Sequence, residues 1–554
     1  MQITSNVNNK VGSDTKKSAE WILKALEDSG VKYVFGIPGV HNIDLFEALI
    51  DTDIETIETR HEQGAVFMAD GYARVSLNLS AVFLITGPGV TNAYTGIAQA
   101  NSDSIPLIAI ATEIETPYIG KNKGFLHELP NQIGLLEQVT KKAIRITNPA
   151  TAYEDTLQVI RESLKEPQKP VYLEVPLDIM VQSDKSQSTE LSSDTASSTI
   201  MADSVQKQLE EAVTLLNESE KPLLYVGGGI RDDEAVRLVR QLAEKVGAAV
   251  ISTVKGKGVV PDNHSLYTGV SWAKEVMDSA IMKESDVVVA VGTRLSARLK
   301  YSGYGDFSLP EKLIHIDPNP NIVSLNFQTA VPIVTDTKNA IRYLVDHVVQ
   351  NNQRREKTEE RVDEVKKGII NKLSEKSPEV ANLFKELRAN LPTSTRLVVD
   401  NCMLGIWAAR YFPIEEPRTF LFPMAYGTLG YAIPAGIGAK LGDPNSPVLI
   451  VSGDGGFMFS SQELSVAKKI GLDITILLVN DNKYGSVDYN QRKKFGRNIA
   501  TNLENPNFKL YAESFGCDYT YVSTPVLLPK VVSETMSKKG IQLIELDGTF
   551  LESY

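Results

Sequence analysis

The feature that most limits the possible folds of this chain is a repeated alternation of short apolar runs with helix-length segments. Each run holds about five mostly β-branched residues, and turn residues separate it from the amphipathic stretch that follows. Continuous apolar runs of this kind are typical of parallel strands that are buried on both faces of a sheet. The predicted strands are Tyr33–Ile37, Ala81–Thr86, Leu107–Thr112, Val171–Val175, Leu223–Val226, Ala249–Ser252, Val287–Val291, Leu313–Ile316, Arg396–Val399, Val448–Val451, Ile474–Val479 and Ile541–Leu546.

Two changes in composition divide the chain into three blocks. Residues 182–204 are rich in Ser, Thr and Asp, and residues 350–377 are dense in charge, with a spacing that suits a solvated helix. A single core rarely grows beyond about 250–300 residues, so a chain of 554 residues needs several domains. We therefore predict three doubly wound α/β domains with parallel sheets, spanning residues 15–182, 205–349 and 378–554.

Charge and cysteine content exclude several classes of protein. The formal net charge of −12 opposes binding to nucleic acid or to an anionic membrane surface, and we find no apolar run of about 18 residues. Two cysteines are too few for a disulfide framework or a four-cysteine zinc site. The sequence predicts a cytoplasmic protein, neither nucleic-acid-binding nor membrane-bound, in which oxygen atoms would hold any metal.

Two motifs follow predicted strands in the third block. The strand that begins at Val448 leads into Gly453, Asp454, Gly455 and Gly456, and the next strand ends at Asn480-Asp481-Asn482. Glycines between a strand and a helix let the backbone approach a phosphate closely. Mg²⁺ is usually held by one or two carboxylates together with phosphate oxygens, so Asp454 and Asp481 suggest a Mg-diphosphate site. The alternative is a simple turn and a helix cap.

This pair of motifs resembles the cofactor fingerprint of the thiamine diphosphate-dependent superfamily that contains acetolactate synthases and pyruvate decarboxylases. The resemblance implies that Asp454, Asp481 and the backbone carbonyl of Lys483 bind Mg²⁺. It also implies that Tyr484 and Gly485 belong to the cofactor site, together with the glycines of the first motif.

A second cluster, RHEQGA, opens an apolar helix-like stretch after a strand-like segment. Its Glu62 has a structural explanation, because an acidic residue at a helix N-terminus interacts favourably with the helix dipole. However, RHEQGA with GIPG at 36–39 and TGPG at 86–89 is similar to the pyrimidine-binding domain of the same superfamily. The resemblance then makes Glu62 the catalytic acid that hydrogen-bonds the aminopyrimidine ring.

The resemblance implies one more cofactor contact, in Gly427-Thr428-Leu429-Gly430. In the family a bulky side chain in such a segment props the cofactor into a bent shape, which makes Leu429 the candidate catalytic contact and Gly427 a cofactor-binding residue. A plain core leucine is the alternative. The family order is a pyrimidine-binding domain, a Rossmann-like middle domain and a diphosphate-binding domain. Because its sites combine domains of different subunits, we expect a homodimer or homotetramer with active sites at the subunit interface.

The middle block gives weaker indications. Tyr225-Val226-Gly227-Gly228-Gly229 follows a strand but lacks a complete dinucleotide-binding pattern, so we interpret it as a structural turn. FAD, which some family members hold in this domain, is an alternative that the sequence does not favour. Arg294 and Arg298 are either surface charges or contacts for a substrate carboxylate.

The reaction itself is less well defined by the sequence. The resemblance implies decarboxylation of a 2-oxo acid, a small-molecule substrate, after which the enamine either adds to a second 2-oxo acid or is protonated to release an aldehyde. Residues 400–412 are similar to FAD-free acetolactate synthases, which convert pyruvate to 2-acetolactate, whereas the N-terminal run resembles 5-guanidino-2-oxopentanoate decarboxylase. We favour the synthase.

One histidine bears on this choice. His127, in the segment GFLHELPNQ, lies in the loop that borders the family's active site, and it is either the catalytic acid that protonation requires or a polar loop residue. The paired histidines of pyruvate decarboxylases are absent. A catalytically silent regulatory or binding subunit is the alternative from another class. Because Tyr554 follows the last predicted strand closely, we expect no C-terminal lid helices.

Overall fold

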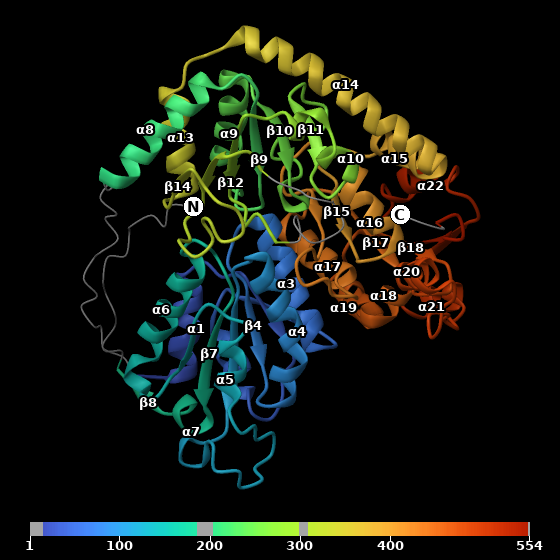
Figure 1. Ribbon diagram of the computed structural model, residues 1–554. Helices are drawn as coiled ribbons and strands as arrows, with labels where there is room; N and C mark the ends of the chain where they lie inside the picture. Colours follow the sequence, from blue (N-terminus) through green and yellow to red (C-terminus); the bar gives the residue numbers. More distant parts are fainter. Residues whose placement is uncertain (1–14, 186–202, 298–308, 552–554) are drawn as a thin grey trace. The chain divides into compact units, whose positions relative to one another are not determined.

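The structure is a computed structural model that describes residues 15–185, 203–297 and 309–551 (Figure 1). The chain divides into two compact units, of which the first holds residues 1–69 and 78–197 and the second holds residues 70–77 and 198–554. Three six-stranded sheets are present, and each is parallel throughout. The α/β fold with three parallel-sheet domains is therefore confirmed, while the domain boundaries stay a prediction. Most of the linker predicted at 182–204 lies outside the described residues.

The first unit contains a sheet with the strand order β3-β2-β4-β5-β7-β6. Its four central strands are almost completely buried, because helices cover both faces. The strands are β2 (Tyr33–Gly36), β3 (Glu55–Glu58), β4 (Ala81–Leu84), β5 (Ile108–Glu113), β6 (Ala143–Arg145) and β7 (Val171–Pro176), beside a small antiparallel pair of β1 (Lys16–Lys17) and β8 (Ser183–Asp184). The helices are α1 (Ser18–Asp28), α2 (Ile43–Ala48), α3 (Glu62–Ser76), α4 (Pro88–Asp103), α5 (Gln132–Glu137), α6 (Ala152–Leu164) and α7 (Leu177–Met180), and the end of α3 is assigned to the second unit.

The middle sheet, in the second unit, has the order β11-β10-β9-β12-β13-β14. Its strands are β9 (Pro222–Val226), β10 (Ala249–Ser252), β11 (Tyr267–Val270), β12 (Val287–Val291), β13 (Lys312–Ile316) and β14 (Val331–Ile333). The helices around it are α8 (Asp203–Glu218), α9 (Asp233–Val246), α10 (Lys274–Met277), α11 (Ala280–Lys283) and α13 (Thr337–His347).

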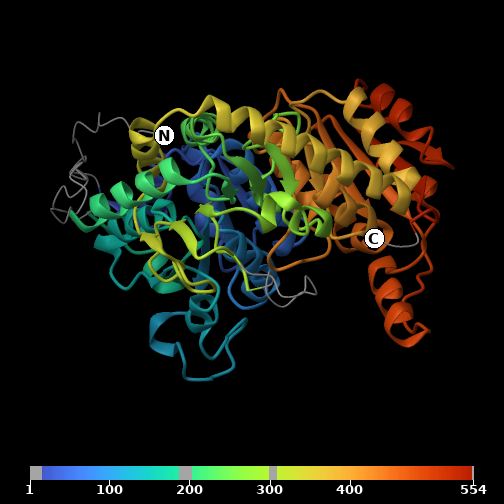
Figure 2. The ribbon, with the colours of Figure 1, turned by 45° about the horizontal axis from the view of Figure 1, so that its top comes forward.

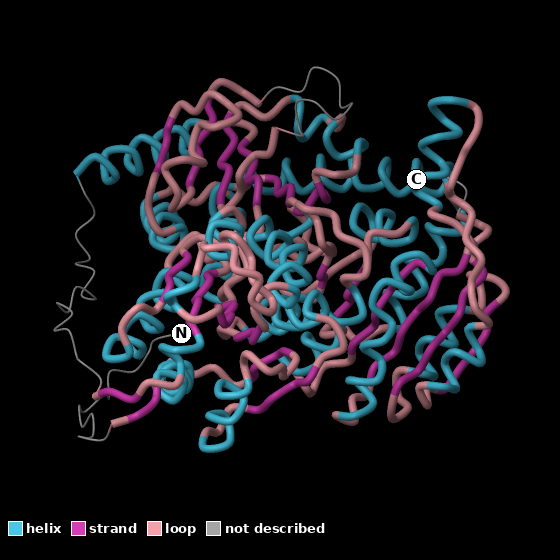
Figure 3. The backbone as a smooth tube through the Cα atoms, turned by 90° about the horizontal axis from the view of Figure 1, so that it is seen from below, coloured by secondary structure: helices cyan, strands magenta, loops and turns pink. Residues whose placement is uncertain are grey.

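The third sheet, also in the second unit, has the order β16-β15-β17-β18-β20-β19. Figure 3 shows the strands of the molecule in magenta, with helices between them in cyan. The strands are β15 (Arg396–Val399), β16 (Phe420–Leu421), β17 (Val448–Gly453), β18 (Ile474–Asn480), β19 (Asp518–Val522) and β20 (Ile541–Asp547). The helices are α16 (Met403–Tyr411), α17 (Ala432–Gly442), α18 (Asp454–Ser460), α19 (Leu464–Lys469), α20 (Gly485–Phe495), α21 (Phe508–Ser514) and α22 (Leu528–Thr535).

The charged run at 350–377 forms a long helix, as its spacing indicated. Helix α14 (Asn352–Lys376) passes along the middle sheet and is followed by α15 (Pro378–Asn390), a path that Figures 1 and 2 both show. The run is not purely solvated, because Val362 is fully buried and the Thr358 hydroxyl donates to the Gly247 carbonyl at 2.8 Å. Among the described residues, no helix has both the length and the apolar character needed to cross a bilayer.

Candidate active site

The two motifs of the C-terminal sheet lie side by side at one edge. Strands β17 and β18 are parallel neighbours in register at Gly453 and Val479, so the residues that follow them emerge together. Asp454 is the first residue of α18, and Asp481 comes directly after β18. This is the carboxyl edge of a parallel sheet, where α/β proteins usually bind ligands.

Asp454 and Asp481 form a close carboxylate pair. Asp454 is 2% exposed, and burial raises its pKa. Burial and the neighbouring charge of Asp454 together raise the pKa of Asp481 to about 7. Two carboxyl groups in this situation do not ionise together unless a cation offsets their repulsion. The oxygen donors present therefore fit a Mg²⁺ ion.

Other ligands for such an ion would have to be oxygens from outside the acidic side chains. No group of three or more His, Cys, Asp and Glu side chains suited to a metal occurs in the described part of the chain. The backbone at Lys483 is the candidate that the motif supplies. At Gly485 a β-carbon would lie 2.5 Å from the Asp481 carboxylate, so a larger residue there would displace this acid.

Asn505 completes this arrangement, and sequence reasoning missed it. Its Nδ2 donates to Asp454 Oδ2 at 2.6 Å and to the side-chain oxygens of Asn480 and Asn482, each at 3.1 Å. One oxygen of the first motif and two oxygens of the second therefore surround the Asn505 side-chain nitrogen. No motif signalled this role, because Asn505 lies in a loop well beyond the second motif.

The loop after β18 is held in place on both sides. Asn482 has a left-handed backbone, with φ of 53°, and its carbonyl accepts from the Leu503 amide at 2.8 Å. The Tyr484 amide donates to the Thr501 carbonyl at 2.8 Å, and the Tyr484 ring packs so closely on Gly455 that a β-carbon there would lie 2.7 Å away. Tyr484 thus contacts both motifs.

Asp400 links the segment that contains Leu429 to the carboxyl edge of the C-terminal sheet. Its carboxylate accepts from the Gly430 amide at 3.1 Å and from the Ser452 hydroxyl at 3.2 Å, and burial raises its pKa to about 6. Gly427 and Gly430 have left-handed backbones, with φ of 76° and 75°, and Leu429 between them is half-buried. This placement is unlike that of a core leucine.

The predicted acid of the first unit is the first residue of α3. Glu62 is half-buried, and its Oε2 accepts from Asn92 Nδ2 at 3.0 Å. The start of the helix is capped by His61, whose Nδ1 accepts from the Gln63 amide at 3.1 Å. Gly89 lies against Glu62, because a β-carbon at this glycine would be 3.5 Å from Oε1. The carboxylate therefore faces the start of α4.

His127 lies at the same edge of this sheet. Its backbone is left-handed, with φ of 65°, and its carbonyl oxygen would be 2.4 Å from a β-carbon at Gly87. Its ring contacts the ring of His41, with 4.9 Å between the centroids. Sequence reasoning missed His41, because the two histidines belong to loops that follow different strands.

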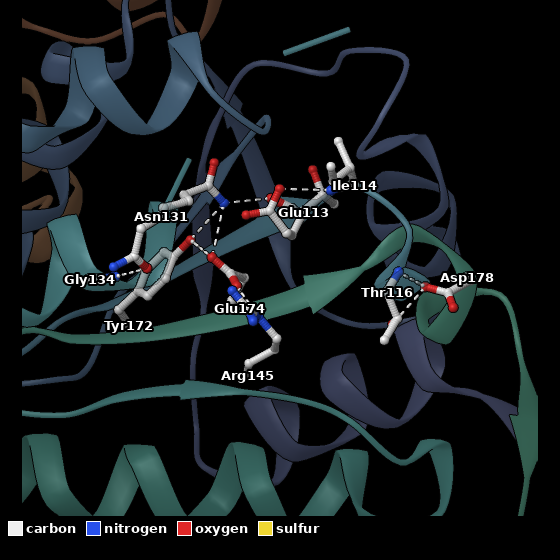
Figure 4. Close-up of polar contacts among 11 residues, drawn as sticks. Glu113, Ile114, Thr116, Asn131, Gly134, Arg145, Tyr172, Glu174 and Asp178 are labelled. Carbon is white, nitrogen blue, oxygen red and sulfur yellow. Dashed lines mark hydrogen bonds and ion pairs between the residues drawn. The ribbon is translucent and has the colours of Figure 1, made fainter. Parts of the chain in front are cut away.

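A buried polar network supports this edge (Figure 4). Gln132 Oε1 accepts from the Gly87 amide at 2.8 Å, and Gln132 Nε2 lies 3.1 Å from Glu174 Oε2. Arg145 pairs with Glu174 at 2.5 Å. Glu113 is 1% exposed, and burial, followed by the charge of Glu174, raises its pKa to about 7. The network thus joins Gly87 to strands β5, β6 and β7.

The middle sheet carries the glycine turn that follows β9. A β-carbon at Gly227 would lie 2.1 Å from the carbonyl oxygen of Gly292, and Gly229 donates its amide to the same oxygen at 2.9 Å. Close backbone packing accounts for these glycines, in agreement with a structural turn. Arg294 is exposed, and Arg298 lies outside the described residues.

The sequence matches the thiamine pyrophosphate enzyme family in three regions. The N-terminal TPP binding domain matches residues 16–135, the central domain matches residues 209–344 and the C-terminal TPP binding domain matches residues 400–546.

Curated relatives are similar over nearly the whole chain. A Pseudomonas aeruginosa protein named probable 2-ketoarginine decarboxylase is 30% identical over 96% of this chain and 94% of its own length. A Methanocaldococcus jannaschii protein named probable acetolactate synthase large subunit is 32% identical over 96% of this chain and 91% of its own length. The acetolactate synthase large subunit of Corynebacterium glutamicum is 30% identical over 90% of this chain and 81% of its own length. The names of these relatives therefore divide between two reactions.

Proposed function

This chain belongs to the thiamine pyrophosphate enzyme family, and from that premise we propose that it is an acetolactate synthase-like carboligase that decarboxylates one 2-oxo acid and joins the remaining fragment to a second. The carboxylate pair of Asp454 and Asp481, at neighbouring strand ends beside a glycine-rich helix start, carries the proposal. Such an arrangement suits a cation bound to a diphosphate. The similarity to acetolactate synthase large subunits favours carboligation.

We assign the parts of the cofactor to these groups. Asp454, Asp481 and the carbonyl of Lys483 would hold Mg²⁺, and the backbone at Gly455 and Gly456 would approach the diphosphate. Bound thiamine diphosphate supplies a sink for the electrons that remain when CO₂ departs.

Two further residues would act on the cofactor rings. Glu62 would hold a proton at the aminopyrimidine ring, and Leu429 would support the bent form of the cofactor. Asn92 orients Glu62 through its hydrogen bond, and Asp400 fixes the backbone beside Leu429. Hydrogen bonds within the chain therefore hold the Glu62 side chain and the backbone next to Leu429.

A decarboxylase that releases an aldehyde is the second candidate. The contact between His41 and His127 favours it, because protonation of carbon needs a positioned acid. The similarity to the 2-ketoarginine decarboxylase supports the same reaction.

We further propose that the active protein is a homodimer or homotetramer whose active sites lie at subunit interfaces. Exposed large side chains beside the two glycine-rich segments support this. Tyr426, which precedes Gly427, is 52% exposed in the single chain, and Met458 and Phe459, which follow Gly456, are 42% and 52% exposed. A second copy of the chain would cover such a surface. The domain limits 15–182, 205–349 and 378–554 and a cytoplasmic location remain part of this proposal.

Product identification tests the reaction. Purified protein is supplied with Mg²⁺, thiamine diphosphate and a panel of 2-oxo acids that includes pyruvate and 5-guanidino-2-oxopentanoate. We expect 2-acetolactate from pyruvate. An aldehyde without any condensation product would refute the synthase and support the second candidate, and binding of the cofactor without turnover of any acid would favour a silent subunit.

A further inference from the structure

Two histidines that are distant in sequence meet at the sheet edge of the first unit. His41 lies in the loop between β2 and α2, and His127 lies in the loop that follows β5. Their rings are edge to face, with an interplanar angle of 60° and 4.9 Å between the centroids. The Nδ1 atoms of both rings are buried, and neither has a hydrogen-bond partner among the described residues. Since buried imidazole nitrogens normally have partners, this pair calls for an explanation.

The loop of His41 is rigid. The side chain of Asn42, which is fully buried, accepts from the Gly39 amide at 2.7 Å and donates to the Ile37 carbonyl at 3.1 Å. The Asn42 amide also donates to the Gly39 carbonyl at 3.0 Å. The backbone that carries His41 is therefore fixed by its immediate neighbour.

The loop of His127 is held in a similar way. Glu128 accepts from the amides of Lys123, Gly124 and Phe125 at 3.2, 2.6 and 3.0 Å. Burial opposes ionisation of Glu128, but these amide hydrogen bonds outweigh it and lower its pKa. His127 itself keeps a left-handed backbone, a conformation that tends to occur at functional sites. The backbone beside each ring is thus held by hydrogen bonds within its own loop.

The pair suits a single transferable proton. The pKa of His41 is lowered by burial and then by His127, while Glu115 opposes the shift. His127 and Glu115 are the charged groups that act on His41 among the described residues. Two imidazoles in contact do not both accept a proton readily, because like charges repel. The pair therefore takes up at most one proton readily.

The pair and Glu62 border the same short stretch of chain, from the loop after β4 to the start of α4. His127 lies against Gly87 in that loop, and Glu62 lies against Gly89 in the first turn of α4. All of these residues belong to the first unit, so the relation does not depend on how the two units are placed.

We infer that His41 and His127 form a proton-transfer pair that supplies the proton consumed in each turnover, with His41 acting through His127. The inference rests on the proposed function. One 2-oxo acid anion and one proton give an aldehyde and CO₂, and two such anions and one proton give an acetohydroxy acid anion and CO₂. The proton goes to carbon in the first reaction and to an alkoxide oxygen in the second, and no oxidant or reductant is needed.

Two assays on the holoenzyme separate this step from C–C cleavage. The first measures product without an added oxidant, and the second measures CO₂ release with ferricyanide, which removes the electrons and makes the protonation unnecessary. We expect His41→Asn to lower kcat without oxidant by about 10- to 100-fold, within the range for general acid–base groups, and to change the ferricyanide rate by less than about threefold. It should also remove one ionisation between about pH 5 and 8 from the profile without oxidant alone.

Two controls accompany this experiment. His41→Phe keeps a ring against His127 and should show the same loss, whereas His347→Asn changes an exposed histidine and should behave like the wild type. Equal losses in both assays, or no loss in either, would overturn the inference while the proposed function stands. A wild type that binds the cofactor but releases no CO₂ from any 2-oxo acid, with or without ferricyanide, would overturn the proposed function and the inference together.

Discussion

Glu113 gives the first unit a pH-dependent stability that one substitution removes. Burial and the charge of Glu174 raise its pKa from 4.5 to about 7. Because each pH unit corresponds to 1.36 kcal/mol, this difference is worth about 3 kcal/mol. The folded chain holds the proton more tightly than the unfolded chain, so the stabilising contribution is complete below pH 4.5 and is lost as the pH rises to about 7.

Glu113→Gln keeps the size of the side chain and removes the ionisation. The free energy of unfolding of this variant minus that of the wild type should therefore increase by about 3 kcal/mol between about pH 4.5 and 7.5, because the wild type loses stability over this range, and the difference should stay level above it. Glu174 should keep its ion pair with Arg145 in both proteins. The effect should be confined to the first unit.

Hydrogen exchange can follow this unit separately from the rest of the chain. We would measure exchange in peptides of β5 and β7, corrected for the pH dependence of intrinsic exchange, for the wild type and the variant between pH 4.5 and 8. Glu137→Gln, at an exposed position of the same unit, is the matched control. A stability difference that does not change with pH would refute the reasoning, because the Glu113 carboxyl would then ionise equally in the folded and unfolded chains.

Four other substitutions test the cofactor site. Glu62→Gln should leave the affinity for thiamine diphosphate within a few-fold of the wild-type value but lower kcat by at least about 100-fold in steady-state assays. Asp481→Asn should weaken Mg²⁺ binding by about 10- to 100-fold in calorimetric titration, while Asp278→Asn, a surface change, should not. Asn505→Ala should weaken the same binding by less, about 3- to 10-fold, and unchanged affinity would remove Asn505 from the site. Leu429→Ala should lower kcat more than cofactor affinity, and the reverse order would contradict its role as a support.

The fold could be predicted from the sequence in the centre of each sheet but not at its edges. Every strand that the apolar runs indicated is present, within one or two residues at its ends, and in each sheet these are the four strands between the two edges. A central strand is buried on both faces, so its sequence is a continuous apolar run. Edge strands such as β3 and β19 are partly exposed and do not need one.

Particular edge strands show the cause. In β3, with the sequence ETIE, only Ile57 is buried, and the sequence indicated merely a strand-like segment before Arg60. In β19 only Val522 is buried. Strand β14 contains Pro332, and β11 contains Gly269, both of which lower the apparent strand propensity. These segments become strands because a neighbouring strand offers unpaired backbone groups for hydrogen bonding. That cause lies in the tertiary structure and not in the local sequence.

The same distinction separates the candidate residues that motifs indicated from those that they did not. The closeness of Asp454 and Asp481 could be predicted because they follow consecutive strands of one sheet, so local sequence order already places them together. Asn505 and His41 had no such signal, and His127 was indicated only by the resemblance of its loop to that of the family. Each lies in a loop whose path is set by distant contacts, such as Asn505 with Asp454 or His127 with the backbone of Gly87. Residues that follow consecutive strands can therefore be brought together by reasoning from motifs, whereas a pair such as His41 and His127 depends on which loops the fold brings into contact.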